Sequence, residues 1–152
     1  MPEYGFRQLD VWRVATELHV AVARLSRRLP ADERFELALQ MRRAAASIPA
    51  NIAEGNGRAF RREYLHFLSI ARGSLMELDN HIEQALRLGY LSAADAGAAI
   101  DLLARTRQLL TRLMQALRRP SMPARPQPST PHSLPDTAHR PSRTAPRDPG
   151  TT

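Results

Sequence analysis

The chain has 152 residues, with 22 arginines against 15 acidic residues and no cysteine or lysine, so its formal net charge is +7. The lack of cysteine excludes disulfides and thiolate metal sites, and the longest uncharged apolar run, residues 44–53, is too short to span a bilayer. The first ten residues also lack the apolar core of a secretion signal, so we expect a soluble, cytoplasmic protein.

Two helices are predicted in the first part of the chain. Apolar residues step by four and three over residues 9–28, which places them on one face of a helix that ends before Pro30: Val11, Ala15, Leu18, Val22 and Leu25. A second helix is expected to begin within residues 31–36 and to end near Glu54, with a buried stripe of the same kind: Met41, Ala45, Ile48 and Ile52.

Pro49 lies inside the second predicted helix. In a helix interior a proline removes one hydrogen bond and clashes with the preceding turn, at about 3 kcal/mol. The helix therefore either kinks there, or stops and restarts with Ser47 as the N-cap. We favour a kink because the apolar stripe keeps its phase across the proline.

The third predicted helix has the strongest periodicity, and it ends at Gly89, a typical left-handed C-cap residue. Its stripe is Tyr64, Leu68, Ala71, Leu75, Leu78, Ile82 and Ala85. The fourth begins at Ser92, where Asp95 completes a variant capping box, and ends at Arg118. Its stripe is Leu103, Thr106, Leu110, Leu113 and Leu117.

These four segments predict an all-α fold, since no segment alternates with period two. Short connections favour an antiparallel up-down-up-down four-helix bundle over residues 1–118. The second and third helices then form a hairpin that turns near Gly57. If residues equally far from Gly57 face each other, the hairpin brings small residues together, with Met41, Ala44 and Ala45 opposite Gly73, Ile70 and Ala71.

Residues 119–152 differ from the rest of the chain. Nine of the twelve prolines lie here, mixed with serine, threonine, arginine and glycine, and no apolar periodicity remains. Such a segment buries too little surface to offset the entropy of ordering. We expect a disordered Pro/Arg-rich tail, which either touches RNA or is a dispensable extension.

Two polar groups are candidate sites. Residues on one flank of the second helix form a row that indicates a subunit contact, a ligand groove or a partly solvated structural flank: Arg43, Ser47, Asn51, Glu54 and Arg58. Five arginines are expected to gather toward the hairpin end, where they either contact a phosphate backbone or form an ordinary solvated surface: Arg42, Arg43, Arg58, Arg61 and Arg62. Interleaved aromatic residues, typical of single-strand binding, amount to Phe60 and Tyr64.

An enzymatic role finds little support in the sequence. Di-iron bundles use Glu-x-x-His on two helices, but here Glu77 precedes His81 by four residues and no second copy exists. No histidine pair suits zinc, and no phosphate loop or nucleophile elbow occurs. We therefore predict no catalytic residues, no cofactor and no metal site.

Several segments together resemble a known family. They are Arg42–Ala45, the run SIPANIAEG at Ser47–Gly55, Phe67–Ala71 and Leu88–Leu91. They resemble the four-helix bundle proteins of the 23S rRNA intervening-sequence family, which are similar to the accessory proteins of diversity-generating retroelements. The resemblance implies a homopentamer without enzymatic activity. For the retroelement relatives it implies binding to nucleic acid and to a reverse transcriptase.

The sequence is thus interpreted as a non-enzymatic homo-oligomer, pentameric by resemblance, that binds nucleic acid, in particular RNA, through surface arginines. The alternative is an interaction scaffold that docks a partner such as a reverse transcriptase, with no direct nucleic-acid role. One departure from the family concerns Phe60, which stands where members usually carry serine or threonine. The third helix is therefore expected to lack a side-chain N-cap, at a cost of about 1 kcal/mol.

Overall fold

The computed structural model describes residues 5–119, which form helices and no strands. Their order is η1 (Phe6–Gln8), α1 (Asp10–Leu25), η2 (Ser26–Arg28), η3 (Ala31–Phe35), α2 (Leu37–Asn56), α3 (Arg61–Arg87) and α4 (Ala93–Arg118). The all-α class is therefore confirmed. The predicted tail over 119–152 lies outside the described residues, except for Arg119.

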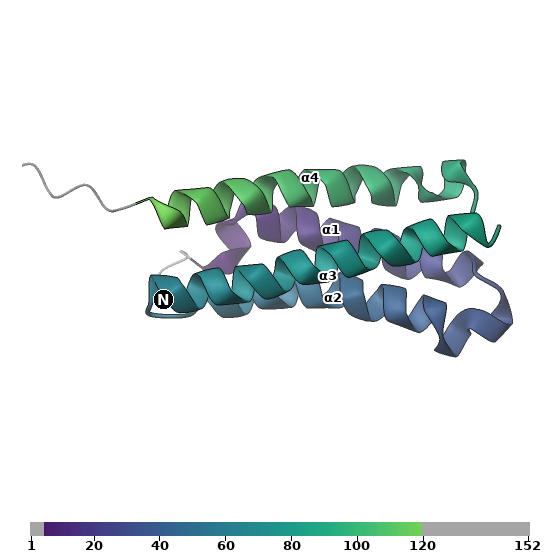
Figure 1. Ribbon diagram of the computed structural model, residues 1–152, viewed down its shortest axis with the longest axis horizontal. Coiled ribbons are helices and arrows are strands. Elements are labelled where there is room, and N and C mark those ends of the chain that lie inside the picture. Colours follow the sequence, from purple (N-terminus) through teal and green to yellow (C-terminus); the bar gives the residue numbers. More distant parts are fainter. Residues whose placement is uncertain (1–4, 120–152) are drawn as a thin grey trace, which may run out of the picture. The chain divides into compact units, whose positions relative to one another are not determined.

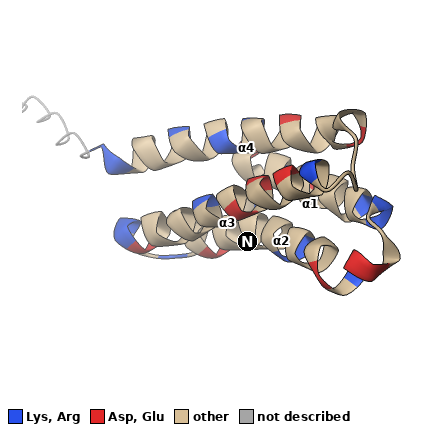
Figure 2. Ribbon diagram, turned by 45° about the vertical axis from the view of Figure 1, so that its right-hand side comes forward, with Lys and Arg blue, Asp and Glu red and all other residues tan. Residues whose placement is uncertain are grey.

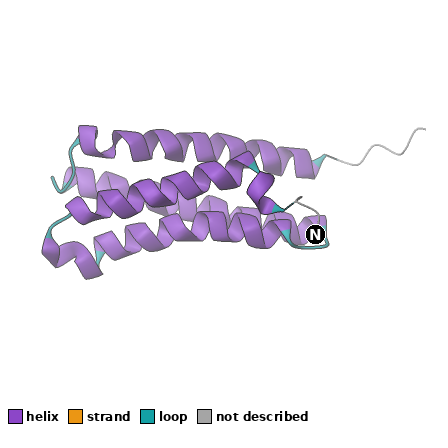
Figure 3. Cartoon of the chain, turned by 180° about the vertical axis from the view of Figure 1, so that it is seen from behind, coloured by secondary structure: helices purple, strands orange, loops and turns teal. Residues whose placement is uncertain are grey.

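The four long helices form an antiparallel bundle (Figures 1 and 3). Helix α1 packs against α2 and α4, and α3 packs against the same two neighbours. Short connections reverse the chain between consecutive helices, over residues 57–60 between α2 and α3 and over residues 88–92 between α3 and α4. The four helices therefore run alternately up and down, as predicted. It brings the start of α3 and the end of α4 to the same end of the bundle.

The core contains the predicted stripes. Every stripe residue of the first two helices is buried, and so is every one of the third except Tyr64, which is partly exposed. In the last turns of α4 the stripe is displaced: Met114 is buried, while Leu113 and Leu117 are partly exposed and pack against the edge of the core. A repeat of seven residues drifts by about 20° per heptad around a straight helix. By the last turns of α4, the face that points into the core has therefore rotated away from the predicted stripe and includes Met114.

The region between α1 and α2 is less helical than predicted. Helix α1 ends at Leu25 and is followed by the 3₁₀ turn η2, so the predicted helix to residue 28 is only partly α-helical. Leu29 is extended, with φ −67° and ψ 153°, because a residue before proline is driven out of the helical region. The 3₁₀ helix η3 then precedes α2.

Helix α2 runs without a break through Pro49, which is buried. The alternative in which the helix stops and restarts with Ser47 as N-cap is therefore wrong. The helix extends two residues beyond its predicted end, to Asn56, and Gly57 follows as its C-cap.

The ends of α3 and α4 follow the predicted signals. Phe60 is the N-cap of α3 and makes no side-chain capping hydrogen bond. Gly89 adopts φ 74°, a left-handed conformation that glycine takes without a steric cost. Ser92 and Asp95 form the capping box of α4. Hydrogen bonds with Ser92 lower the pKa of the Asp95 carboxyl below its ordinary value, and the bond with the Ser92 hydroxyl has a larger effect than the bond with its backbone.

The α2–α3 hairpin has a different register from the predicted one. Ser47 Oγ lies 2.8 Å from Ser74 Oγ, seven residues further along α3 than a turn centred on Gly57 requires. Because α2 is longer than predicted and a four-residue connection follows, the chain folds back nearer Phe60. The predicted pairing of Met41, Ala44 and Ala45 with Gly73, Ile70 and Ala71 is therefore wrong by about two turns.

The close approach between α2 and α3 occurs at Gly55 instead. A Cβ atom added there would lie 2.8 Å from Tyr64 Cδ2 and 2.9 Å from Phe67 Cβ, whereas one added at Gly73 would meet no atom within 4 Å. Only glycine lets the first turns of α3 lie this close to the last turn of α2. This contact fixes the geometry of the hairpin end.

Candidate functional site

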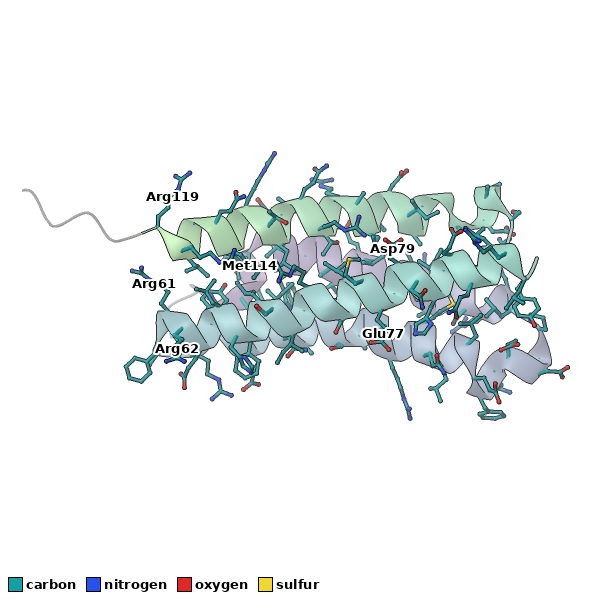
Figure 4. All side chains as sticks on the ribbon, viewed as in Figure 1. Arg61, Arg62, Glu77, Asp79, Met114 and Arg119 are labelled. Atoms are coloured by element: carbon teal, nitrogen blue, oxygen red, sulfur yellow. The ribbon has the colours of Figure 1, made fainter. Side chains whose placement is uncertain are left out.

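Arginines gather at the end of the bundle where α2 turns into α3 and where α4 stops. We call this the basic end, defined by Arg58, Arg61, Arg62, Arg118 and Arg119. Figure 4 shows Arg61, Arg62 and Arg119 at this end of the bundle. In Figure 2 the start of α3 and the end of α4 are blue, the colour of basic residues. Residues 54–63 and 118–119 carry five arginines against Glu54 and Glu63.

Arg58 lies in the connection between α2 and α3. Its guanidinium pairs with Glu54 one turn earlier and lies 4.7 Å from the centre of the Phe67 ring. The arginine side chain is 41% exposed, so water screens the ion pair, which contributes little to stability. The Phe67 ring holds the cation in a defined position while one face stays open to solvent.

Arg61 and Arg62 begin α3. The Nη1 atom of Arg61 donates a hydrogen bond of 3.1 Å to the Arg119 carbonyl, which links the start of α3 to the end of α4. Arg62 borders an open hollow of about 400 Å³ together with Arg58, Glu63, His66 and Phe67. Segments far apart in the sequence thus supply one basic surface.

Aromatic side chains accompany these arginines. Phe60 is 70% exposed, and the His66 and Phe67 rings meet edge to face at 5.7 Å. Tyr64 is less available, since its hydroxyl accepts a 3.5 Å hydrogen bond from Asn56 and burial raises the pKa of its phenol above the ordinary value. Phe67 is a further aromatic residue of this surface, and its position beside Arg58 depends on how α3 packs against the end of α2.

The prediction that Arg42 and Arg43 join the basic end is wrong. They lie 14 and 13 residues before Asn56, where α2 ends, and at 1.5 Å per residue this places them roughly 20–21 Å from the end of the helix that leads to Arg58. Arg42 instead bonds to the α1–α2 region, with Nη1 3.3 Å from Ser26 Oγ and Nη2 3.2 Å from the Arg34 carbonyl. Arg43 is exposed on α2.

The predicted polar row divides into two parts. Asn51 donates to the Ser47 carbonyl and hydroxyl at 2.8 and 3.0 Å, and Ser74 donates to the Ile70 carbonyl at 3.2 Å. Ser47 must therefore donate in its 2.8 Å bond to Ser74. This chain of bonds joins α2 to α3, which supports the structural interpretation for Ser47 and Asn51. Glu54 instead pairs with Arg58 at the basic end.

Residues 5–119 contain no group of three or more histidine, cysteine, aspartate or glutamate side chains that could hold a metal ion. His81 lies 3.5 Å from Glu77, but no further ligand of that kind joins them. None of the helices in this part of the chain is both long and apolar enough to cross a membrane.

Comparison with known proteins shows a family match and a likeness to solved structures. A sequence model of the family described as 23S rRNA-intervening sequence protein matches residues 7–112. The fold is similar to the 1.70 Å crystal structure of a protein with unknown function from the S23 ribosomal protein family of Bacteroides thetaiotaomicron VPI-5482. That likeness has a TM-score of 0.65 at 23% identity, over 69% of this chain and 98% of the other. No curated protein shows a significant sequence match.

Proposed function

The chain belongs to the 23S rRNA-intervening sequence protein family, and from this premise we propose that it is a non-enzymatic, homo-oligomeric four-helix bundle that binds RNA through its basic end. The observation that carries the proposal is that two separate parts of the chain bring arginines to one end of the bundle, where Arg61 bonds to the Arg119 carbonyl and Arg58 lies 4.7 Å from the Phe67 ring. We further propose that it works without a cofactor, in the cytoplasm.

The chemistry of the basic end suits single-stranded RNA. Arginine guanidinium groups bond to phosphate oxygens in a fixed planar geometry, and the first turn of α3 adds the positive end of a helix dipole. Phe60, 70% exposed beside Arg61, offers a face on which an unpaired base can stack. Base stacking is tolerant of sequence, so we expect weak sequence preference and strong dependence on salt.

A salt titration tests this function. Binding of a fluorescent single-stranded RNA should weaken as salt rises, with log K against log salt falling at a slope of about −2 to −3.5, as expected for roughly three to five phosphate contacts. The five arginines of the basic end can make this number of phosphate contacts. A slope near zero, or no retention of RNA at low salt, would contradict the proposal.

The oligomer is proposed to be a homopentamer, on the family resemblance. Subunit contacts would cover apolar side chains that are exposed on three helices of the single chain: Val20, Ile70, Met76 and Ile100. Light scattering at micromolar concentration should give about 85 kDa, five times the 17.0 kDa of one chain. A species of one chain mass would refute the assembly while leaving RNA binding open.

The alternative function is an interaction scaffold that docks a partner such as a reverse transcriptase. The similarity to accessory proteins of diversity-generating retroelements, on which this partner depends, stays a prediction. A reverse transcriptase recovered with the protein after nuclease treatment, combined with no retention of purified RNA, would favour the scaffold over RNA binding.

A further inference from the structure

A second basic feature lies away from the basic end, where the last turn of α1 and the connection η2–η3 meet α2. These segments border a cavity of about 770 Å³ that is partly open to solvent. Its walls include Ser26, Arg27, Leu29, Pro30, Arg34 and Arg42. This volume lies within the range of about 300–1,000 Å³ that small-molecule sites occupy.

The cavity carries three positive charges and no negative one among its lining residues. Within the described residues, Arg27, Arg34 and Arg42 form no ion pair, whereas the adjacent Arg28 pairs with Asp95 and does not line the cavity. Three uncompensated guanidinium groups around one hollow create a field that favours a multiply charged anion.

Acidic residues do occur in the same connection, at Asp32, Glu33 and Glu36, but none lines the cavity. The Glu33 carboxylate is engaged elsewhere, since it accepts hydrogen bonds from the Tyr90 hydroxyl at 2.9 Å and from the Leu37 backbone at 3.3 Å. The C-terminal end of α1 adds about half a negative charge nearby, which the three arginines outweigh.

Arg42 is held in place before any ligand arrives. Ser26 is 3% exposed, and its hydroxyl donates to the Ala23 carbonyl at 3.0 Å while accepting from Arg42 Nη1 at 3.3 Å. Arg42 Nη2 donates to the Arg34 carbonyl at 3.2 Å. These bonds use two of the five N–H groups of the guanidinium and leave the others for an acceptor. The Arg34 guanidinium is itself positioned 5.9 Å from the centre of the Phe35 ring.

We propose that this cavity is a binding site for a small phosphate-bearing anion with two or more negative charges, separate from the RNA surface. Phosphate oxygens suit paired guanidinium donors. The remaining walls are aliphatic, and no aromatic side chain lines the cavity to stack a nucleobase. The ligand is therefore recognised through its phosphate groups. This inference does not depend on the proposed RNA binding.

Isothermal titration of the full chain with inorganic pyrophosphate tests the site, with chloride at equal ionic strength as the reference. Arg27→Gln combined with Arg34→Gln removes two charges without removing the hydrogen bonds of Arg42. Pyrophosphate should bind the wild type and should bind this double variant at least about tenfold more weakly, because charge-assisted hydrogen bonds are lost. Arg24→Gln is the control, because Arg24 lies in the last turn of α1 but does not line the cavity. It should change the affinity for pyrophosphate by less than about twofold.

Three results would overturn the proposal. The first is a wild type that binds pyrophosphate no better than chloride. The second is an equal loss in Arg24→Gln, which would indicate general electrostatic attraction. The third is a loss of RNA retention in the double variant, which would assign the cavity to the RNA surface. Retained pyrophosphate binding in a variant of the basic end that no longer retains RNA would separate the two sites and support the proposal.

Discussion

Replacing Arg58, Arg61 and Arg62 together by glutamate is expected to weaken binding of single-stranded RNA at least about a hundredfold at 0.1 M salt. The change removes three phosphate contacts and places three negative charges against the RNA backbone. The fold should survive, because glutamate at two positions in the first turn of α3 interacts favourably with the helix dipole. Retention of labelled RNA on a filter measures the affinity, and circular dichroism checks the helix content.

The matched control reverses the same amount of charge elsewhere. Arg24, Arg87 and Arg105 are exposed, and Arg87 lies at the far end of α3, roughly 39 Å from Arg61 at 1.5 Å per residue. Changing these three to glutamate should weaken binding far less than the changes at the basic end. If both triple variants lose RNA equally, net charge rather than a defined surface accounts for binding, and the proposed site is wrong.

Leu78→Ala is expected to lower the free energy of unfolding by about 2–5 kcal/mol. The Leu78 side chain is fully buried in the core between α3 and its neighbours, so its truncation leaves a cavity that the packed helices cannot close. Thermal denaturation should show a midpoint lower by about 4–8 °C for each kcal/mol lost.

Leu88→Ala is the control for this variant, because Leu88 lies ten residues later at the end of α3 and is 59% exposed. Its truncation should change the stability by no more than about 0.5 kcal/mol. Equal losses in the two variants would mean that the burial pattern of α3 differs from the one described.

The site was only partly predictable. The placement of Arg58, Arg61 and Arg62 at the hairpin end follows from sequence order alone, since Arg58 lies in the connection between α2 and α3 and the other two begin α3. Arg118 and Arg119 could have been added from topology, because the fourth helix of an up-down-up-down bundle ends beside the start of the third. The position of Phe67 under Arg58 needs the tertiary structure, because it depends on the close contact at Gly55.

Arg42 illustrates the opposite error. We expected it beside the arginines of the hairpin end, but 14 residues of continuous helix separate it from Asn56 at the end of α2, a distance of about 21 Å. Its partners, Ser26 and the Arg34 carbonyl, come from a connection whose 3₁₀ turns carry no apolar periodicity to predict them. The cavity between these residues therefore could not be predicted from the sequence.

The amino-acid order by itself determined the four helices, their capping at Ser92 and Gly89, and nearly all of the buried stripes, because helical periodicity and cap chemistry depend on residues within a few turns. The tertiary structure decided the register of α2 against α3 and the division of the arginines between two surfaces. Register depends on contacts between residues far apart in the chain, here Ser47 with Ser74 and Gly55 with Tyr64. An error of two turns in that register leaves every local pattern intact, so no local signal could reveal it.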